Sequence, residues 1–332
     1  MRTSIHGNGT ATPNIALVKY WGKRDPDRNL PFTDTVAVVL DQGRTHVNIG
    51  EWSEDGVWWQ FAGRSVRLTG GPVSPYIRML DHARSFHGVT QSLRVVVSPS
   101  LPPRIGFAGS AAAMAAMAAA LMDAFQLDLD LWELSGLARI GSGSAARSVP
   151  DGFVRWYAGD AADGMDSYAE SLFPPEHWPD LRLVLVPIDR TAKEVPSTRA
   201  MLRCQQTSPL FSGWLDRCRA DLNPVTEALG RCDIETLGEV AEGNARWMHA
   251  VALAADPPIL YWTRDTVRIF EAMSALRQGG TGVWCTIDAG PNPVLITLDG
   301  DVEQVSQVVR DVLPGIEPIV ARPGLGATAG LS

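Results

Sequence analysis

Short runs of apolar and β-branched residues characterise the first third of the chain. Four of these runs have the length of a strand and are bounded by Gly, Asp or Pro, at residues 36–40, 45–49, 57–61 and 93–98. Alanine then dominates residues 110–125, and its high helix propensity predicts a buried helix there. Strand, glycine-containing loop and helix therefore follow one another, which is the order that a phosphate-binding turn uses.

The pattern becomes more helical in the middle of the chain. Residues 131–139 predict a helix, and residues 153–156 predict a short strand. A strongly apolar run at 182–187 has the length of a strand, and helical periodicity then extends over residues 207–254. The contrast with the strand-rich beginning indicates two differently built parts.

The last fifty residues alternate between strands and a helix. We expect strands at 282–287 and 293–298 and an amphipathic helix at 302–313. This order indicates an antiparallel α+β layer. We place the domain boundary near residue 185, which divides the chain into residues 1–185 and 186–332.

The composition excludes several classes of protein. With 332 residues, 45% hydrophobic and 20% charged, the chain is long enough for two globular domains. Its net charge of -8 argues against nucleic acid as a partner, because binding a phosphate backbone requires clustered Lys and Arg. The longest run of small apolar residues, 111–122, is shorter than the ~20 residues that span a bilayer, so we expect no membrane partner.

The cysteines and the N-terminus favour a reduced, cytoplasmic protein. Cys204, Cys218, Cys232 and Cys285 show neither CxxC spacing nor nearby paired histidines, so the sequence predicts no protein-bound metal and no disulfide framework. Residues 1–12 lack the basic segment and apolar run of a signal peptide.

A cluster of cations near the N-terminus is the first candidate site. Lys19, Lys23 and Arg24 lie close together and are interleaved with aromatic residues. A solvated edge strand would explain the charges alone. Gly22, however, allows the backbone to approach a ligand, and Tyr20 and the lysines can all donate hydrogen bonds to phosphate oxygens. Both explanations remain open on these residues.

The segment before the alanine-rich helix is a candidate anion site. Gly106, Gly109 and Ser110 lie where the chain enters the helix, and free N–H groups at a helix start attract phosphate. The Gly-Lys-Ser/Thr ending of a Walker A loop is absent. Taken alone, these residues favour an ordinary tight turn.

Two further segments carry candidate chemistry. Ser142 and Ser144 offer hydroxyls, and Arg147 can bind a carboxylate or phosphate with two parallel hydrogen bonds. Asp288 ends an apolar strand. A flexible loop and a turn carboxylate are the alternatives for these two segments.

Five motifs, taken in order, resemble one known family. They are residues 14–25, 141–148, 206–210, 248–249 and 288–292, and the similarity extends from about residue 10 to about residue 327. The sequence resembles diphosphomevalonate decarboxylase, within the GHMP kinase superfamily.

The resemblance implies a fold, a reaction and a set of partners. The fold is α+β, the GHMP kinase two-domain fold, with an N-terminal domain like ribosomal protein S5 domain 2, a ferredoxin-like C-terminal domain and the active site in the cleft between them. The reaction uses ATP and Mg2+ to phosphorylate the tertiary 3-hydroxyl of a small phosphorylated 3-hydroxy acid, and phosphate and CO2 then leave to give an alkene. A homodimer is also implied.

The resemblance also implies roles for individual residues. Asp288 would deprotonate or orient the 3-hydroxyl, Arg147 would bind the C1 carboxylate, and Lys19 would lie near the transferring phosphoryl group. The residues implied to hold the distal phosphate of the substrate are Tyr20, Lys23, Ser142, Ser144 and Ser197, and those implied to contact the ATP phosphates are Gly106, Ala108, Gly109, Ser110 and Ala111.

Two departures from the family pattern leave the substrate open. An arginine expected to follow the paired serines near Ser197 is displaced to Arg199 or lost, since Thr198 stands at its position, and Asp34 stands where a small polar residue is usual. An extra carboxylate would repel a diphosphate by about 1 kcal/mol or more at ~4 Å. A phosphomevalonate decarboxylase and a mevalonate 3-kinase-like enzyme are therefore the alternative enzymes. The altered glycine loop at 103–110 leaves a third alternative, a nucleotide-binding protein that has lost catalysis.

Overall fold

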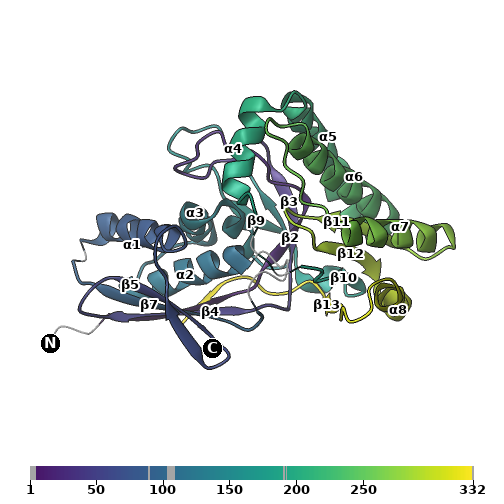
Figure 1. Ribbon diagram of the computed structural model, residues 1–332. Helices are drawn as coiled ribbons and strands as arrows, with labels where there is room; N and C mark the ends of the chain where they lie inside the picture. Colours follow the sequence, from purple (N-terminus) through teal and green to yellow (C-terminus); the bar gives the residue numbers. More distant parts are fainter. Residues whose placement is uncertain (1–4, 89, 103–108, 190, 192, 331–332) are drawn as a thin grey trace.

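The part of the chain that the structure describes forms three β-sheets with helices packed on them (Figure 1). The computed structural model describes residues 5–88, 90–102, 109–189, 191 and 193–330. The strands are β1 (His6–Ala11), β2 (Asn14–Val18), β3 (Thr35–Val39), β4 (Thr45–Glu51), β5 (Gly56–Phe61), β6 (Arg64–Arg67), β7 (Leu93–Pro99), β8 (Phe153–Trp156), β9 (Ala169–Phe173), β10 (Leu181–Leu185), β11 (Val283–Ile287), β12 (Pro293–Leu298), β13 (Ile319–Ala321) and β14 (Thr328–Ala329). The helices are α1 (Ser74–His87), α2 (Gly109–Phe125), α3 (Leu131–Gly141), α4 (Ser197–Thr207), α5 (Phe211–Arg231), α6 (Ile234–Leu253), α7 (Arg264–Gln278) and α8 (Val302–Val312), with short 3-10 turns η1 (Gly143–Ser148), η2 (Pro175–His177) and η3 (Asp299–Asp301).

The first sheet, in the order β14-β1-β4-β7-β5-β6, carries the alanine-rich helix α2 on its inner side. The close approach explains the unusual composition of both elements. A Cβ added to Gly9 of β1 would lie 2.2 Å from the carbonyl oxygen of Ala116, and one added to Gly7 would lie 2.3 Å from that of Ala120. Only glycine facing alanine fits at this separation, so the alanine run is a packing feature, and the prediction of a buried helix is confirmed.

The second sheet, in the order β2-β3-β8-β9, positions most of the chemistry. The register of β2 against β3 shifts between Ala16 and Val18, which marks a bulge near the end of the strand. A bulge twists the strand locally and redirects the side chains that follow it. Lys19 is the first residue beyond this strand.

The third sheet, β11-β12-β10-β13, is antiparallel throughout, as the C-terminal pattern predicts. Alternate residues of β10 enter different cores. Leu183 and Leu185 join a core with α5, α6 and the second sheet, whereas Val184 packs with residues of α7 and α8. One continuous hydrophobic core therefore joins the second and third sheets.

The α+β two-part fold that we expected is confirmed, and the ends of most expected elements agree within a few residues. The expected boundary near residue 185 remains a proposal. β10 is hydrogen-bonded to β12 and β13, so we propose that the division precedes Leu181. In the described ranges, no helix combines the length and apolar character that crossing a bilayer requires.

Candidate active site

An ion pair joins the two halves of the chain. Lys19 follows β2 and Asp288 follows β11, and Lys19 Nζ lies 2.7 Å from Asp288 Oδ1 across a sequence separation of 269 residues. The same amine donates a second hydrogen bond of 2.8 Å to the Ala16 carbonyl. Lys19 is buried, but the Asp288 side chain is 39% exposed. The carboxylate is therefore fixed on one oxygen and accessible to a ligand.

Arg147 is a buried cation next to this pair. It lies in η1, where its Nε donates to Asn14 Oδ1 and its Nη1 donates to Thr35 Oγ1, both at 2.9 Å. Asn14 is held in turn by donating to Ser148 Oγ at 2.8 Å. No carboxylate of the described residues forms an ion pair with Arg147, so the guanidinium is oriented by neutral groups and its charge is available to an anion.

Burial and neighbouring charges shift the ionisation of this centre. Burial raises the pKa of Asp288, but the cations Lys19, Arg147 and Lys193 outweigh it, and the pKa lies below its usual value. Burial lowers the pKa of Lys19 and brings that of Arg147 to about 10. Asp288 is thus ionised at neutral pH and can accept a proton or orient a hydroxyl.

His249 stays neutral beside this centre. Burial, followed by the charge of Lys19, lowers its pKa to about 3, and its Nε2 lies 3.2 Å from the Asp288 carbonyl oxygen. The histidine therefore supports the backbone at Asp288 and adds no charge.

Most of the residues expected to bind the distal phosphate form two small groups of polar contacts. Lys23 Nζ donates to Asn29 Oδ1 at 2.6 Å, and the Tyr20 hydroxyl donates to the Asn29 carbonyl at 3.4 Å. Ser142 and Ser144 lie with their hydroxyls 3.3 Å apart. Burial, with a smaller effect of Arg78, lowers the pKa of Lys23 to about 8.

The first residues of α4 lie close to Lys23 and Lys193. Thr198 Oγ1 lies 3.5 Å from Lys23 Nζ, and Ser197 Oγ lies 3.3 Å from Lys193 Nζ. Burial lowers the pKa of Lys193, while the charge of Asp288 acts in the opposite direction. Ser197 and Thr198 each therefore lie close to one lysine, an arrangement that suits binding of a phosphate.

Sequence reasoning missed Lys193, Asn14 and Thr35. A compositional signal pointed to the first of them. The chain contains only three lysines, Lys19, Lys23 and Lys193, and all three lie in this region, whereas arginine supplies the other basic side chains. Asn14 and Thr35 carry no comparable signal, because polar residues in strands are common.

The expected ATP contacts are described in part. Gly106 and Ala108 lie outside the described residues. Gly109 and Ser110 begin α2 and are exposed, and a Cβ added to Gly109 would meet nothing within 4 Å. Ala111 is buried in the helix. The first turn of α2 carries no acidic residue that would oppose an anion.

Asp34 does not present an uncompensated charge to this site. Its Oδ2 accepts hydrogen bonds of 3.0 and 2.7 Å from Arg155, and its Oδ1 accepts one of 2.8 Å from the Ala158 N–H. The repulsion that the sequence suggested is therefore largely cancelled. Arg199, the nearest arginine to Ser197, is exposed.

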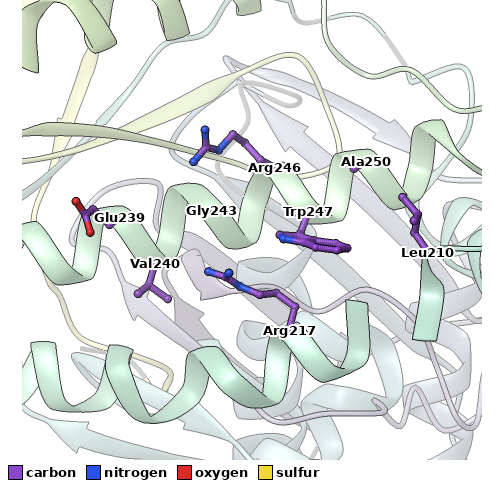
Figure 2. Close-up of a pocket in the computed structure, with 8 residues that line it drawn as sticks. All are labelled: Leu210, Arg217, Glu239, Val240, Gly243, Arg246, Trp247 and Ala250. Carbon is purple, nitrogen blue, oxygen red and sulfur yellow. The ribbon is translucent and has the colours of Figure 1, made fainter. Parts of the chain in front are cut away.

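A separate groove of about 560 Å3 lies on the outer surface of α5 and α6 (Figure 2). Arg217, Arg246 and Trp247 line it together with apolar residues. None of the residues expected from the sequence lies in this groove. Within the described ranges, no three His, Cys, Asp or Glu side chains gather as ligands for a metal ion.

The fold and the site together define the GHMP kinase class: two α+β halves, joined here by the ion pair of Lys19 and Asp288. The N-terminal half, residues 11–169, matches the diphosphomevalonate decarboxylase-like N-terminal domain. Residues 182–322 match the mevalonate 5-diphosphate decarboxylase C-terminal domain. The chain belongs to the diphosphomevalonate decarboxylase family.

Relatives and solved structures agree with this assignment. Diphosphomevalonate decarboxylase mvd1 of Aspergillus fumigatus is 33% identical over 94% of this chain and 81% of its own length. The Homo sapiens diphosphomevalonate decarboxylase is 34% identical over 93% and 80%. The structure of MDDEF in complex with MVAPP, AMPPCP and magnesium has a TM-score of 0.92 and 30% identity, and covers 99% of this chain and 100% of its own.

Proposed function

We propose that this chain is an ATP-dependent carboxy-lyase that decarboxylates diphosphomevalonate to an alkene, isopentenyl diphosphate, with Mg2+. One observation carries the proposal: Asp288, ionised and partly exposed, lies against Lys19 and within the electrostatic influence of Arg147, a buried cation without an ion-pair partner among the described residues. The relatives carry the name of this enzyme, and MDDEF binds MVAPP together with AMPPCP and magnesium.

The chemistry begins with the 3-hydroxyl. Asp288 orients the hydroxyl or takes its proton while the oxygen forms a bond to the γ-phosphorus of ATP and the bond to ADP breaks. Lys19 lies on the same carboxylate and can stabilise the charge of the transferring phosphoryl group. Phosphoryl transfer depends mainly on such positioning and electrostatic stabilisation.

Decarboxylation follows from the new leaving group. The C3–O bond breaks with its electron pair on phosphate, the electrons of the C1–C2 bond form the C2=C3 double bond, and CO2 departs. Arg147 orients the C1 carboxylate for this cleavage. Each fixed donor aimed at developing charge in a dry cleft is worth on the order of 3 kcal/mol of barrier.

The phosphate groups of the substrate and of ATP accept hydrogen bonds from the other residues of the site. Tyr20, Lys23, Ser142, Ser144 and Ser197 bind the distal phosphates of the substrate, and Gly109, Ser110 and Ala111 at the start of α2 face the ATP phosphates. Mg2+ typically binds through substrate phosphates and only one or two carboxylates, so the lack of a ligand cluster in the described part of the chain fits this ion.

The alternative substrates have lost part of their support. Asp34 favoured a phosphomevalonate decarboxylase or a mevalonate 3-kinase-like enzyme because its charge would repel a diphosphate. Arg155 neutralises that charge, so the replacement of arginine by Thr198 remains as the main support.

A substrate panel tests the proposal. Purified protein with ATP and Mg2+ is given mevalonate, its 5-phosphate or its 5-diphosphate, and ADP and CO2 are measured together. We expect the highest kcat/KM and equal amounts of ADP and CO2 with the diphosphate. Formation of ADP without CO2 would show that the protein is a kinase. Preference for the 5-phosphate, with CO2 release, would show that it is a phosphomevalonate decarboxylase.

We also propose that the protein is a cytoplasmic homodimer. The family resemblance supports the dimer, and the four unpaired cysteines support a reducing compartment. Light scattering of the purified protein should give twice the chain mass of 35.9 kDa. A mass equal to one chain would refute the dimer.

A further inference from the structure

The backbone of Lys19 requires a partner that the sheet does not supply. β2 ends at Val18 after its bulge, so the buried N–H of Lys19 lies outside the ladder with β3. It donates instead to the side-chain oxygen of Asn244, at 2.9 Å. Asn244 lies in α6 and is fully buried. The side chain of Asn244 thus accepts the backbone hydrogen bond of Lys19 that a neighbouring strand would otherwise accept.

A second helix fixes the orientation of that amide. Asn244 Nδ2 donates to Asp221 Oδ2 of α5 at 2.8 Å, and Arg217 Nε donates to the same oxygen at 2.8 Å. An ionised carboxylate only accepts hydrogen bonds, so it selects the amide nitrogen and turns the amide oxygen toward Lys19. The hydrogen bonds therefore link Arg217, Asp221, Asn244 and the Lys19 N–H in one continuous series.

The series of contacts extends from the protein surface to the active site. Arg217 lines the groove shown in Figure 2, Asp221 is 4% exposed, and Lys19 is 2% exposed. Cys218, one residue after Arg217, lies with its Sγ 4.0 Å from the Lys19 carbonyl oxygen and 3.9 Å from Asn244 Nδ2. Both sides of the Lys19 backbone consequently face α5 and α6.

We propose that Asn244 and Asp221 are positioning residues, which fix the Lys19 backbone so that its amine stays on Asp288. Neither residue touches the reacting atoms. The inference rests on the proposed function, because it assigns Lys19 and Asp288 to the reaction. Without Asn244, the Lys19 N–H would be buried with no acceptor, and the backbone would move to find one.

Asn244→Ala is the first test, with Val225→Ala as its matched control. Val225 is buried one turn from Asp221 in α5, and its aliphatic side chain packs in the core and can make no hydrogen bond to the network. We expect Asn244→Ala to lower kcat about 100-fold, because a displacement of ~1 Å can cost this much, with the KM for ATP nearly unchanged. Val225→Ala should lower the melting temperature and leave kcat per folded molecule unchanged.

The pH profile separates positioning from loss of stability. Lys19, Arg147 and Lys193 are the charges that face Asp288, and neutral His249 lies behind it. Moving Lys19 away removes the cation with the largest effect, so the pKa of Asp288 rises and the acid limb of kcat/KM moves to higher pH in Asn244→Ala. It should not move in Val225→Ala. An Asn244→Ala enzyme with unchanged kcat and an unchanged acid limb would overturn the proposal.

An exchange of the two side chains covers the case in which Asn244→Ala does not fold. Asn244→Asp alone places two carboxylates side by side and should lower kcat. Combining it with Asp221→Asn restores one amide and one carboxylate, so kcat should recover to within about tenfold of the wild type. If the double variant folds and is no more active than Asn244→Asp, the network does not act through Lys19.

Lysine NMR tests the positioning without any substrate. Labelling lysine with 13C at Cε gives signals from only three residues, and the signal missing in Lys19→Arg identifies Lys19. We expect its pH titration to change in Asn244→Ala and not in Val225→Ala. A changed signal with no CO2 release by the wild type would refute the proposed function and keep the positioning, whereas normal turnover with an unchanged signal would refute the positioning alone.

Discussion

The two ends of the candidate active site are built differently. At the reaction end, Lys19 and Arg147 are held by partners at 2.7 to 2.9 Å, and those partners are themselves fixed. At the phosphate end the contacts are mixed. Lys23 Nζ donates to the neutral Asn29 Oδ1 at 2.6 Å, whereas the Ser142 and Ser144 hydroxyls lie 3.3 Å apart. In the described ranges, Lys23 and Lys193 have no carboxylate partner. The reaction end is therefore organised in advance, whereas the phosphate end has charge that an anion would neutralise.

This difference predicts different kinetic effects of substitution. Groups that are fixed before binding act mainly on the rate of the chemical step. Donors that gain their acceptor only from the substrate act mainly on affinity. Changes at the reaction end should lower kcat, and changes at the phosphate end should raise KM.

The largest effect is expected at Asp288. Asp288→Asn keeps the shape and can still accept from Lys19, but it removes the group that takes or orients the hydroxyl proton. We expect kcat to fall about 10³-fold or more, with a melting temperature within a few degrees of the wild type because the side chain is partly exposed. Coupled measurement of ADP and thermal denaturation checks both; a fall of less than tenfold would contradict the role.

Arg147→Lys should come next. Lysine keeps the charge but cannot reproduce the donors directed at Asn14, Thr35 and a carboxylate together. We expect kcat/KM to fall about 100-fold and the free energy of unfolding to fall by about 2 kcal/mol. Arg155→Lys, at the ion pair with Asp34, is the control and should retain most activity. Equal losses of kcat/KM in Arg147→Lys and Arg155→Lys would contradict a specific role of Arg147 in binding the carboxylate.

The alkaline pH dependence tests the phosphate end. The pKa of Lys23 is about 8, so its charge is lost as the pH rises through that value. We expect KM for the diphosphate substrate to rise about tenfold between pH 7 and about 9.5, with kcat nearly constant. Lys23→Arg should abolish this rise, because arginine stays protonated. A parallel fall in kcat would place Lys23 at the reaction end instead.

The smallest effects are expected at the two serines. Ser142→Ala and Ser144→Ala each remove one neutral hydroxyl, so KM should rise about fivefold for each, which corresponds to ~1 kcal/mol. Because the hydroxyls contact each other, the double variant should lose less than the sum of the two. Initial rates over a range of substrate concentrations give kcat and KM for each variant. A fall in kcat larger than the rise in KM would contradict the placement of these serines at the phosphate end.

The sequence predicted local structure better than the supporting contacts. Strong local signals, such as the alanine run of α2 and the apolar run of β12, define elements that the structure contains. β1 was missed because its glycines lower strand propensity, and their reason is the contact with α2, which is far away in sequence.

In the site, too, the sequence indicated the functional residues but not the residues that orient them. Asp288, Lys19 and Arg147 were found by their resemblance to a family, and the structure places them together; their roles remain predictions. Asn14, Thr35 and Asn244 orient them through contacts between distant segments, and the type of residue alone does not indicate such contacts. The bulge that directs Lys19 likewise depends on pairing with β3.

Single-turnover measurement of Asp288→Asn tests the central claim most directly. Enzyme in excess over substrate labelled with 14C at C1 is mixed with ATP and Mg2+, quenched, and analysed for ADP and CO2. The wild type should form both in equal amounts, and the variant should bind the substrate but form neither product at a comparable rate. Rapid formation of ADP by the variant would show that the carboxylate does not activate the hydroxyl.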